Sequence, residues 1–238
     1  MADLIANFTL MLKSLFYQSN LNTINMQGTG FSWLTRPMLK REGVELTAAQ
    51  SHRLYEYFNT NPSFITLIVG IFVREIKDGK TAFTTKAVYS SAFAALGDSF
   101  YWHALRPTLF MLALFVCVNI SPLGIAIYPL IFSALHISLL AMGYPLGRHF
   151  GEHTILLFNR VKFSRWANIA DGMSLFLLGA FIGKLLKGGY SEDLWILIAG
   201  LVAFKMGAIL YRRINLNIFL WLLIVAIIAI LIFWGILS

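Results

Sequence analysis

The sequence predicts an all-α integral membrane protein with cytoplasmic N-terminal helices, a re-entrant helical hairpin and about five transmembrane helices. Of its 238 residues, 58% are hydrophobic and only 13% are charged, whereas a soluble domain carries about 25% charged residues. The mean hydropathy is +0.71. Residues 218–237 carry no charged side chain and are long enough to cross a bilayer core of about 30 Å as a helix. This composition excludes a soluble domain, a disordered chain and a disulfide scaffold.

The chain is basic, with 19 Lys+Arg against 11 Asp+Glu and a net charge of +8. In a membrane protein such residues concentrate in cytoplasmic loops and orient the helices. No basic stripe with interleaved aromatic residues is present, so nucleic acid is not an expected partner. The lone Cys117 lies in an apolar run and cannot form a disulfide within the chain.

Residues 1–60 form the polar part of the chain and predict a helical cytoplasmic segment. Its first 15 residues do not resemble a signal peptide, because Asp3 stands where such a peptide is positively charged. They predict an amphipathic helix that lies on the membrane or packs against a partner. The apolar residues at helical spacing are Leu4, Phe8, Met11, Leu12 and Leu15.

Residues 61–238 predict the membrane domain. It begins with a hairpin over about 62–105, because the apolar run 62–74 is too short for a standard span and suits a re-entrant or a buried helix. A polar tip and a stretch of small residues complete the hairpin. The predicted spans then follow at about 106–119, 122–142, 169–186, 194–210 and 216–237. With the basic loops in the cytoplasm, this layout requires that the hairpin make no net crossing.

The first candidate site is the sequence YFNTNP at residues 57–62. Its side chains Asn59, Thr60 and Asn61 offer hydrogen-bond donors and acceptors, which suits a ligand made of hydroxyl groups. The alternative is a helix cap, since Asn or Thr before Pro62 is typical of a helix start. The two roles are compatible, and both stay open.

The second candidate is GDSFYWHALRP at residues 97–107. Asp98 and Arg106 are ionisable groups in a membrane-associated stretch, where such groups face a cavity or a partner. Gly97 permits close backbone approach, and Tyr101 and Trp102 are able to stack on a sugar. The alternative is an interfacial position, where aromatic rings lie at the headgroup level and arginine reaches toward water.

The third candidate is HFGEH at residues 149–153, which fits the H-x-x-E-H pattern of some zinc hydrolases. His149 and His153 would ligate zinc from one helix face, with Glu152 as general base. Gly151 weakens the helix that this requires, and no third ligand is evident. A polar cytoplasmic loop is the favoured interpretation, and neither a metal nor another cofactor is expected.

Three stretches together give the sequence a family resemblance: SLFYQSNLNTINMQGTGF at 14–31, YEYFNTNP at 55–62 and AALGDSFYWHALRPTLF at 94–110. They resemble, in order and spacing, the motifs of the IID membrane subunit of mannose/fructose/sorbose-type sugar phosphotransferase systems (PTS). The resemblance covers about residues 12–186 and weakens beyond.

The resemblance implies a non-catalytic subunit of the bacterial inner membrane that forms a sugar path with a IIC subunit. Cytoplasmic IIA and IIB subunits would relay phosphate through their own histidines, so no phosphorylated residue is expected in this chain. Carried over by motif, Gln27, Asn59, Thr60 and Asn61 become candidates to line the site of a hexose-type sugar. Asp98, Trp102 and Arg106 become candidates to hold the hairpin or the IIC interface. The alternatives are the zinc hydrolase and a solute channel unrelated to PTS.

Overall fold

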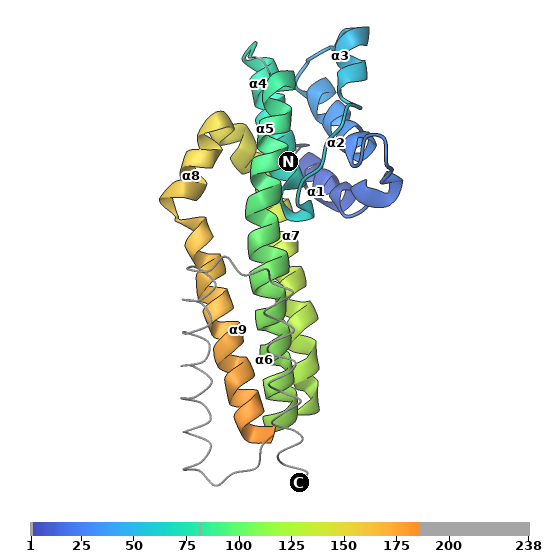
Figure 1. Cartoon of the computed structure of the whole chain (residues 1–238). Coiled ribbons are helices and arrows are strands. Elements are labelled where there is room, and N and C mark those ends of the chain that lie inside the picture. Colours follow the sequence, from blue (N-terminus) through green and yellow to red (C-terminus); the bar gives the residue numbers. More distant parts are fainter. Residues whose placement is uncertain (1, 81, 186–238) are drawn as a thin grey trace. The chain divides into compact units, whose positions relative to one another are not determined.

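The structure is a computed structural model of the chain, and it describes residues 2–80 and 82–185 (Figure 1). Every regular element in these residues is a helix, as the sequence predicts. The chain divides into two compact units, residues 1–174 and 175–238. The contacts described below lie within the first unit. The predicted spans at about 194–210 and 216–237 lie outside the described residues.

The described elements follow one another through short connections. In chain order they are α1 (Ala2–Ser14), η1 (Tyr17–Asn20), α2 (Gly28–Arg41), α3 (Ala48–Arg53), η2 (Pro62–Phe64), α4 (Ile65–Lys77), α5 (Ala82–Gly97), η3 (Asp98–Leu105), α6 (Arg106–Asn119), η4 (Pro122–Ala126), α7 (Ile127–Phe150), η5 (Gly151–His153), α8 (Thr154–Arg160) and α9 (Phe163–Leu185).

The predicted amphipathic helix at the N-terminus is α1. Leu10 and Ser14 are buried and Met11 packs partly against the core. The rest of its apolar face is exposed among the described residues; it comprises Leu4, Ile5, Phe8 and Leu12, and the exposed Leu15 follows directly after the helix. An exposed apolar face of this size on a helix is typical of contact with a membrane or a partner protein.

Helix α4 is the centre of the unit and is almost completely buried. Ile65, Ile68 and Val73 have no exposed surface, because α1, α2, α5 and α7 all pack against this helix. The apolar run that is too short to span a membrane is therefore a buried helix, one of the two interpretations that the sequence left open. Its re-entrant position in a membrane stays a prediction.

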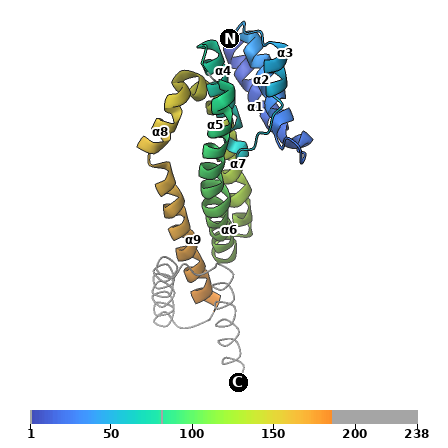
Figure 2. The same ribbon diagram turned by 45° about the horizontal axis from the view of Figure 1, so that its top comes forward.

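Glycines allow α4 and α7 to pack backbone against backbone; both helices run beside α5 in Figure 1 and Figure 2. A Cβ atom at Gly147 of α7 would overlap the backbone oxygen of Leu67, and one at Gly143 would overlap the Thr66 side chain. Gly70 of α4 lies as closely against the backbone of Tyr144. Two small residues four apart are a common device for close helix packing in membranes.

Helices α5, η3 and α6 form one continuous helix of 38 residues, Ala82–Asn119. The sequence places a boundary near residues 105 and 106, between the hairpin and the first span, but the helix continues through it. The reason is the π-helical geometry of η3, in which the Arg106 amide donates to the carbonyl oxygen of Tyr101. The wider turn accommodates Pro107, whose ring would otherwise crowd the carbonyl oxygen of His103.

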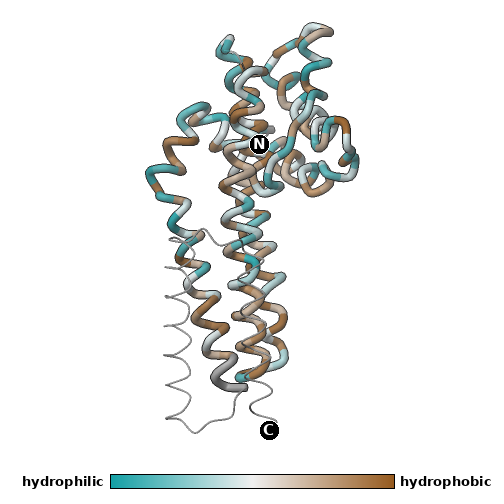
Figure 3. The backbone as a smooth tube through the Cα atoms, viewed as in Figure 1, coloured by the Kyte–Doolittle hydropathy of each residue, from teal (hydrophilic) through white to brown (hydrophobic). Residues whose placement is uncertain are grey.

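A second long helical segment, Pro122–Arg160, spans 39 residues and contains η4, α7, η5 and α8. The two segments are the helices among the described residues that are long and apolar enough to cross a membrane. Figure 3 shows apolar residues along α6 and the adjoining part of α7, and more polar residues toward α2 and α3.

Candidate functional site

The segment between α3 and α4 is the first predicted site, and it starts the helical region with a side-chain cap. The Asn61 Oδ1 atom accepts a hydrogen bond from the Ser63 amide at 3.1 Å, and Pro62 occupies the first position of η2. The cap that the sequence indicates is therefore present, and it falls on Asn61. Since Asn61 is only 1% exposed, this bond is buried.

Gln27 holds the same segment from the N-terminal motif. Its Nε2 donates to the Thr60 carbonyl oxygen at 3.0 Å, and its Oε1 accepts from the Thr60 amide at 2.8 Å. The side-chain amide of Gln27 thus pairs with both backbone groups of Thr60, as the backbone of a neighbouring β-strand would. Both hydrogen bonds are buried, so each is expensive to lose without replacement.

The third motif joins through Asp98. The Asn61 Nδ2 donates to Asp98 Oδ1 at 2.9 Å. The approach is close because the preceding residue is a glycine: a Cβ atom at Gly97 would overlap the Asn61 side chain. Asn61 therefore uses its oxygen for the cap and its amide nitrogen for the carboxylate.

His136 of α7 adds a contact to this cluster, with its Nδ1 atom 2.8 Å from Ser63 Oγ. Ser63 is buried, and the imidazole is half-buried between the helices. Together Gln27, Thr60, Asn61, Ser63, Asp98 and His136 form what we call the polar cluster. It links α2, η2, η3 and α7.

Lys86 of α5 fixes the segment that leads into the cluster. Its ammonium group donates to the carbonyl oxygens of Arg53, Leu54 and Glu56 at 3.1, 3.3 and 3.2 Å. It also lies 5.3 Å from the ring centroid of Phe31. A buried cation is costly unless hydrogen bonds compensate it, and these three carbonyl groups occupy all three of its protons.

Two polar groups of the predicted sugar site remain uncommitted within the described residues. The Thr60 hydroxyl is buried and has no hydrogen-bond partner there. Asn59 is half-buried, and no hydrogen bond of its side chain is seen among these residues. A buried hydroxyl without a partner is unfavourable, so Thr60 would gain from a ligand, water or neighbouring subunit.

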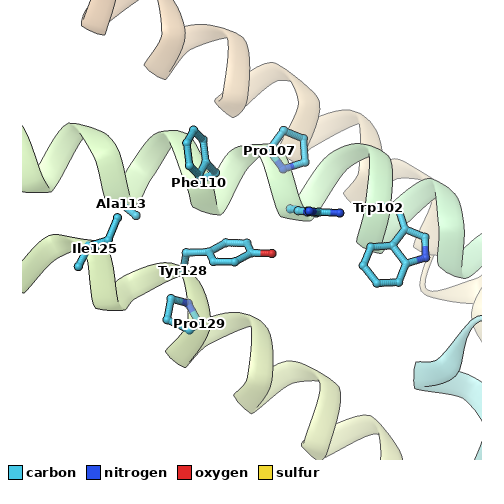
Figure 4. Close-up of a pocket in the computed structure, with 8 residues that line it drawn as sticks. Trp102, Pro107, Phe110, Ala113, Ile125, Tyr128 and Pro129 are labelled. Atoms are coloured by element: carbon cyan, nitrogen blue, oxygen red, sulfur yellow. The ribbon is translucent and has the colours of Figure 1, made fainter. Parts of the chain in front are cut away.

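Trp102 and Arg106 lie beside a cavity of about 770 Å³ between α6 and the start of α7 (Figure 4). The Arg106 guanidinium lies over the Trp102 ring, 5.9 Å from its centroid. The other walls are mostly apolar: Pro107, Phe110, Ala113, Ile125, Tyr128 and Pro129. Asn59, Thr60 and Asn61 do not line this cavity. Trp102 and Arg106 therefore lie apart from the substrate-binding candidates, whereas Asp98 joins them through Asn61.

The HFGEH pattern does not form a two-histidine face on one helix. α7 ends at Phe150 and Gly151 adopts a φ of +53°, which places His149 and His153 in different elements. The Glu152 carboxylate forms an ion pair with Lys80 at 2.9 Å. The described residues contain no group of three His, Cys, Asp or Glu side chains able to hold a metal. The zinc interpretation therefore gains no support.

Sequence reasoning did not pair Ser63 with His136 or single out Lys86. Glu75 was also missed: this buried carboxylate accepts a hydrogen bond from the Tyr89 hydroxyl at 2.7 Å. The only signal in the sequence was charge, since Lys86 and Glu75 interrupt otherwise apolar or small-residue stretches.

Comparison with known families gives a clear match. The model of the PTS system mannose/fructose/sorbose family IID component matches residues 5–192. The chain belongs to this family. The match includes all three motifs on which the resemblance rests.

Curated relatives carry the same family names. The PTS system mannose-specific EIID component of Escherichia coli K12 is 24% identical over 187 residues, which cover 74% of this chain and 66% of the relative. The fructose permease IID component of Bacillus subtilis is 25% identical over 191 residues, covering 74% and 68%. The match thus spans about two thirds of the length of these relatives.

Solved structures share the fold. A chain described as a membrane protein superposes with a TM-score of 0.68 at 19% identity, covering 97% of this chain and 96% of that one. A chain of the mannose transporter ManYZ, in complex with microcin E492, gives 0.54 at 19% identity, covering 97% and 95%.

Proposed function

We propose that this chain is the IID membrane subunit of a mannose-family PTS permease. With a IIC subunit it would form the path for phosphoenolpyruvate-dependent sugar uptake coupled to phosphorylation. One observation carries the proposal beyond family membership: the three family-like motifs meet in space. Gln27 binds the backbone of Thr60, and Asn61 binds Asp98, so residues 33 and 37 positions apart form one cluster.

The proposed role is that of a non-catalytic subunit. The polar cluster consists of amides, hydroxyls, one imidazole and one carboxylate, and its Asp98 and His136 are bound to Asn61 and Ser63. Phosphate transfer is assigned to the IIA and IIB subunits. Asn59 and the Thr60 hydroxyl are the groups in this region with bonding capacity left, so we assign them the sugar contact.

The proposed location is the bacterial inner membrane, with several crossings. In the most apolar part of Pro122–Arg160, only 6% of the residues are buried within the chain. Such an exposed apolar surface requires lipid or a partner subunit. Around the α4–α5 turn lie Arg74, Lys77 and Lys80, and by the positive-inside rule we place this end in the cytoplasm. This proposed placement replaces the re-entrant position that the sequence indicates for the hairpin.

The experiment is complementation of sugar uptake. Co-expression with a IIC subunit and the phosphocarrier subunits in a strain lacking its own mannose-family IID should restore uptake of a labelled hexose. Uptake should depend on phosphoenolpyruvate and yield the sugar phosphate. Absence of uptake, while this chain and IIC co-purify as a complex, would contradict the transport role.

A further inference from the structure

The cavity beside Trp102 has the features of a lipid site. Its walls are apolar, apart from the Arg106 guanidinium, the Trp102 indole and the Tyr128 hydroxyl. In Figure 4 the Tyr128 ring lies across the cavity with its hydroxyl toward the Trp102 end. Polar donors thus lie toward one end, and Phe110, Ala113 and Ile125 toward the other. An amphiphile has the same division between its head and its chain.

Arg106 lacks an acidic partner within the described part of the chain. Its guanidinium is exposed, none of the ion pairs there includes it, and its contact is the Trp102 ring face at 5.9 Å. A cation in a membrane-associated stretch pairs with an anionic group or reaches the headgroup region. The planar guanidinium is well matched to phosphate, which it binds through two parallel hydrogen bonds.

The depth of the cavity fits a lipid headgroup at Arg106. At about 1.5 Å per residue, Trp102 lies about 26 Å along the helix from Asn119, where the helix ends. This distance is close to the roughly 30 Å thickness of the bilayer core. If the turn after Asn119 lies at one boundary, Trp102 lies near the other, at the level where indole rings are enriched.

We propose that this cavity binds an anionic phospholipid of the cytoplasmic leaflet. The inference rests on the membrane location proposed above. The phosphate contacts Arg106 near the Trp102 ring, and one acyl chain extends between α6 and α7 along Phe110 and Ile125. The cytoplasmic leaflet is the anionic one, and basic pockets between membrane helices on that side bind anionic headgroups.

The test uses the complex of this chain with its IIC subunit, purified in detergent. It is exposed to phosphatidylglycerol or phosphatidylcholine with identical acyl chains, and retained lipid is counted by native mass spectrometry. Wild type should retain phosphatidylglycerol preferentially. Arg106→Gln should weaken this retention about five-fold or more, Arg106→Lys less so, and the control Arg160→Gln, an exposed cation on α8, should not.

Equal retention of the two lipids by wild type, or unchanged retention by Arg106→Gln, would overturn the lipid site. Loss of IIC together with lipid in Arg106→Gln would also overturn it, because the arginine would then act at the subunit interface. Failure of wild type to bind IIC would instead count against the proposed function.

A second measurement does not depend on the folding of an arginine variant. Phosphatidylglycerol brominated on its acyl chains should quench the tryptophan emission of a Phe110→Trp variant more than that of wild type. Equal quenching of the two proteins would contradict an acyl chain in this cavity.

Discussion

Replacement of Gln27 by alanine should destabilise the complex rather than its sugar site. The substitution removes two buried hydrogen bonds, at 2.8 and 3.0 Å, and leaves the Thr60 amide and carbonyl groups without their partner. Two hydrogen bonds are worth about 1 kcal/mol each, and an unsatisfied buried group adds to the cost. The loss of unfolding free energy is therefore about 2–4 kcal/mol. For a domain of this size, it lowers the melting temperature by about 4–16 °C.

The assay compares the Gln27→Ala variant with an Asn59→Ala variant of the complex, by thermal melting and by sugar affinity. Asn59 is half-buried and forms no side-chain hydrogen bond seen among the described residues. Asn59→Ala should leave the melting temperature nearly unchanged. It should weaken sugar binding about ten-fold, because it removes a polar contact worth about 1–3 kcal/mol. Unchanged melting of Gln27→Ala with loss of affinity would refute this division of roles.

Three further substitutions test other parts of the structure. Asp98→Asn keeps an acceptor oxygen for Asn61, so the unfolding free energy should fall by only about 1 kcal/mol. The yield of the complex with IIC should fall more than the sugar affinity. Equal falls in yield and affinity would contradict an interface role for Asp98. Gly147→Ala should lower the melting temperature through overpacking of about 1–3 kcal/mol. Gly172→Ala, where no described atom lies within 4 Å of an added Cβ, should be neutral or stabilising. His149→Ala with His153→Ala should leave uptake nearly unchanged, and loss of uptake together with bound zinc would revive the metal interpretation.

The helical class and the buried α4 could be predicted because they depend on local pattern. An apolar run of the length of α4 cannot cross a bilayer and must find cover in protein. The sequence also indicated the cap before Pro62, which depends on neighbours only. The length and burial of the run do not, however, reveal that Gly143 and Gly147 bring α7 against it.

The same rules do not determine how far the first predicted span extends backwards through residues 105 and 106. A polar cluster followed by Pro107 is typical of a helix boundary. The π-helical turn of η3 removes the conflict by changing the register of the backbone hydrogen bonds, so that the Arg106 amide reaches the Tyr101 carbonyl oxygen. At HFGEH the local pattern misleads in the opposite direction. A zinc site would need His149 and His153 on one continuous helix, but the helix ends before Gly151, which has a positive φ.

The polar cluster illustrates a second limit of sequence reasoning. Gln27 and Thr60 are 33 positions apart, and Ser63 and His136 are 73 apart. Each residue by itself offers both a ligand-binding and a structural interpretation. The packing of α2 and α7 around the start of α4 determines which polar atoms of the cluster form hydrogen bonds with neighbouring residues.

The occupancy of these atoms limits how the chain can contact a sugar. Gln27 uses both atoms of its amide group on Thr60, and Asn61 uses its oxygen and its nitrogen on Ser63 and Asp98. A sugar bound by either residue would have to break a buried hydrogen bond, which offsets what it gains. Asn59 and the Thr60 hydroxyl carry no such cost. If the chain acts as proposed, we therefore expect Asn59 and the Thr60 hydroxyl to contact the sugar, while Gln27 and Asn61 hold the backbone in place.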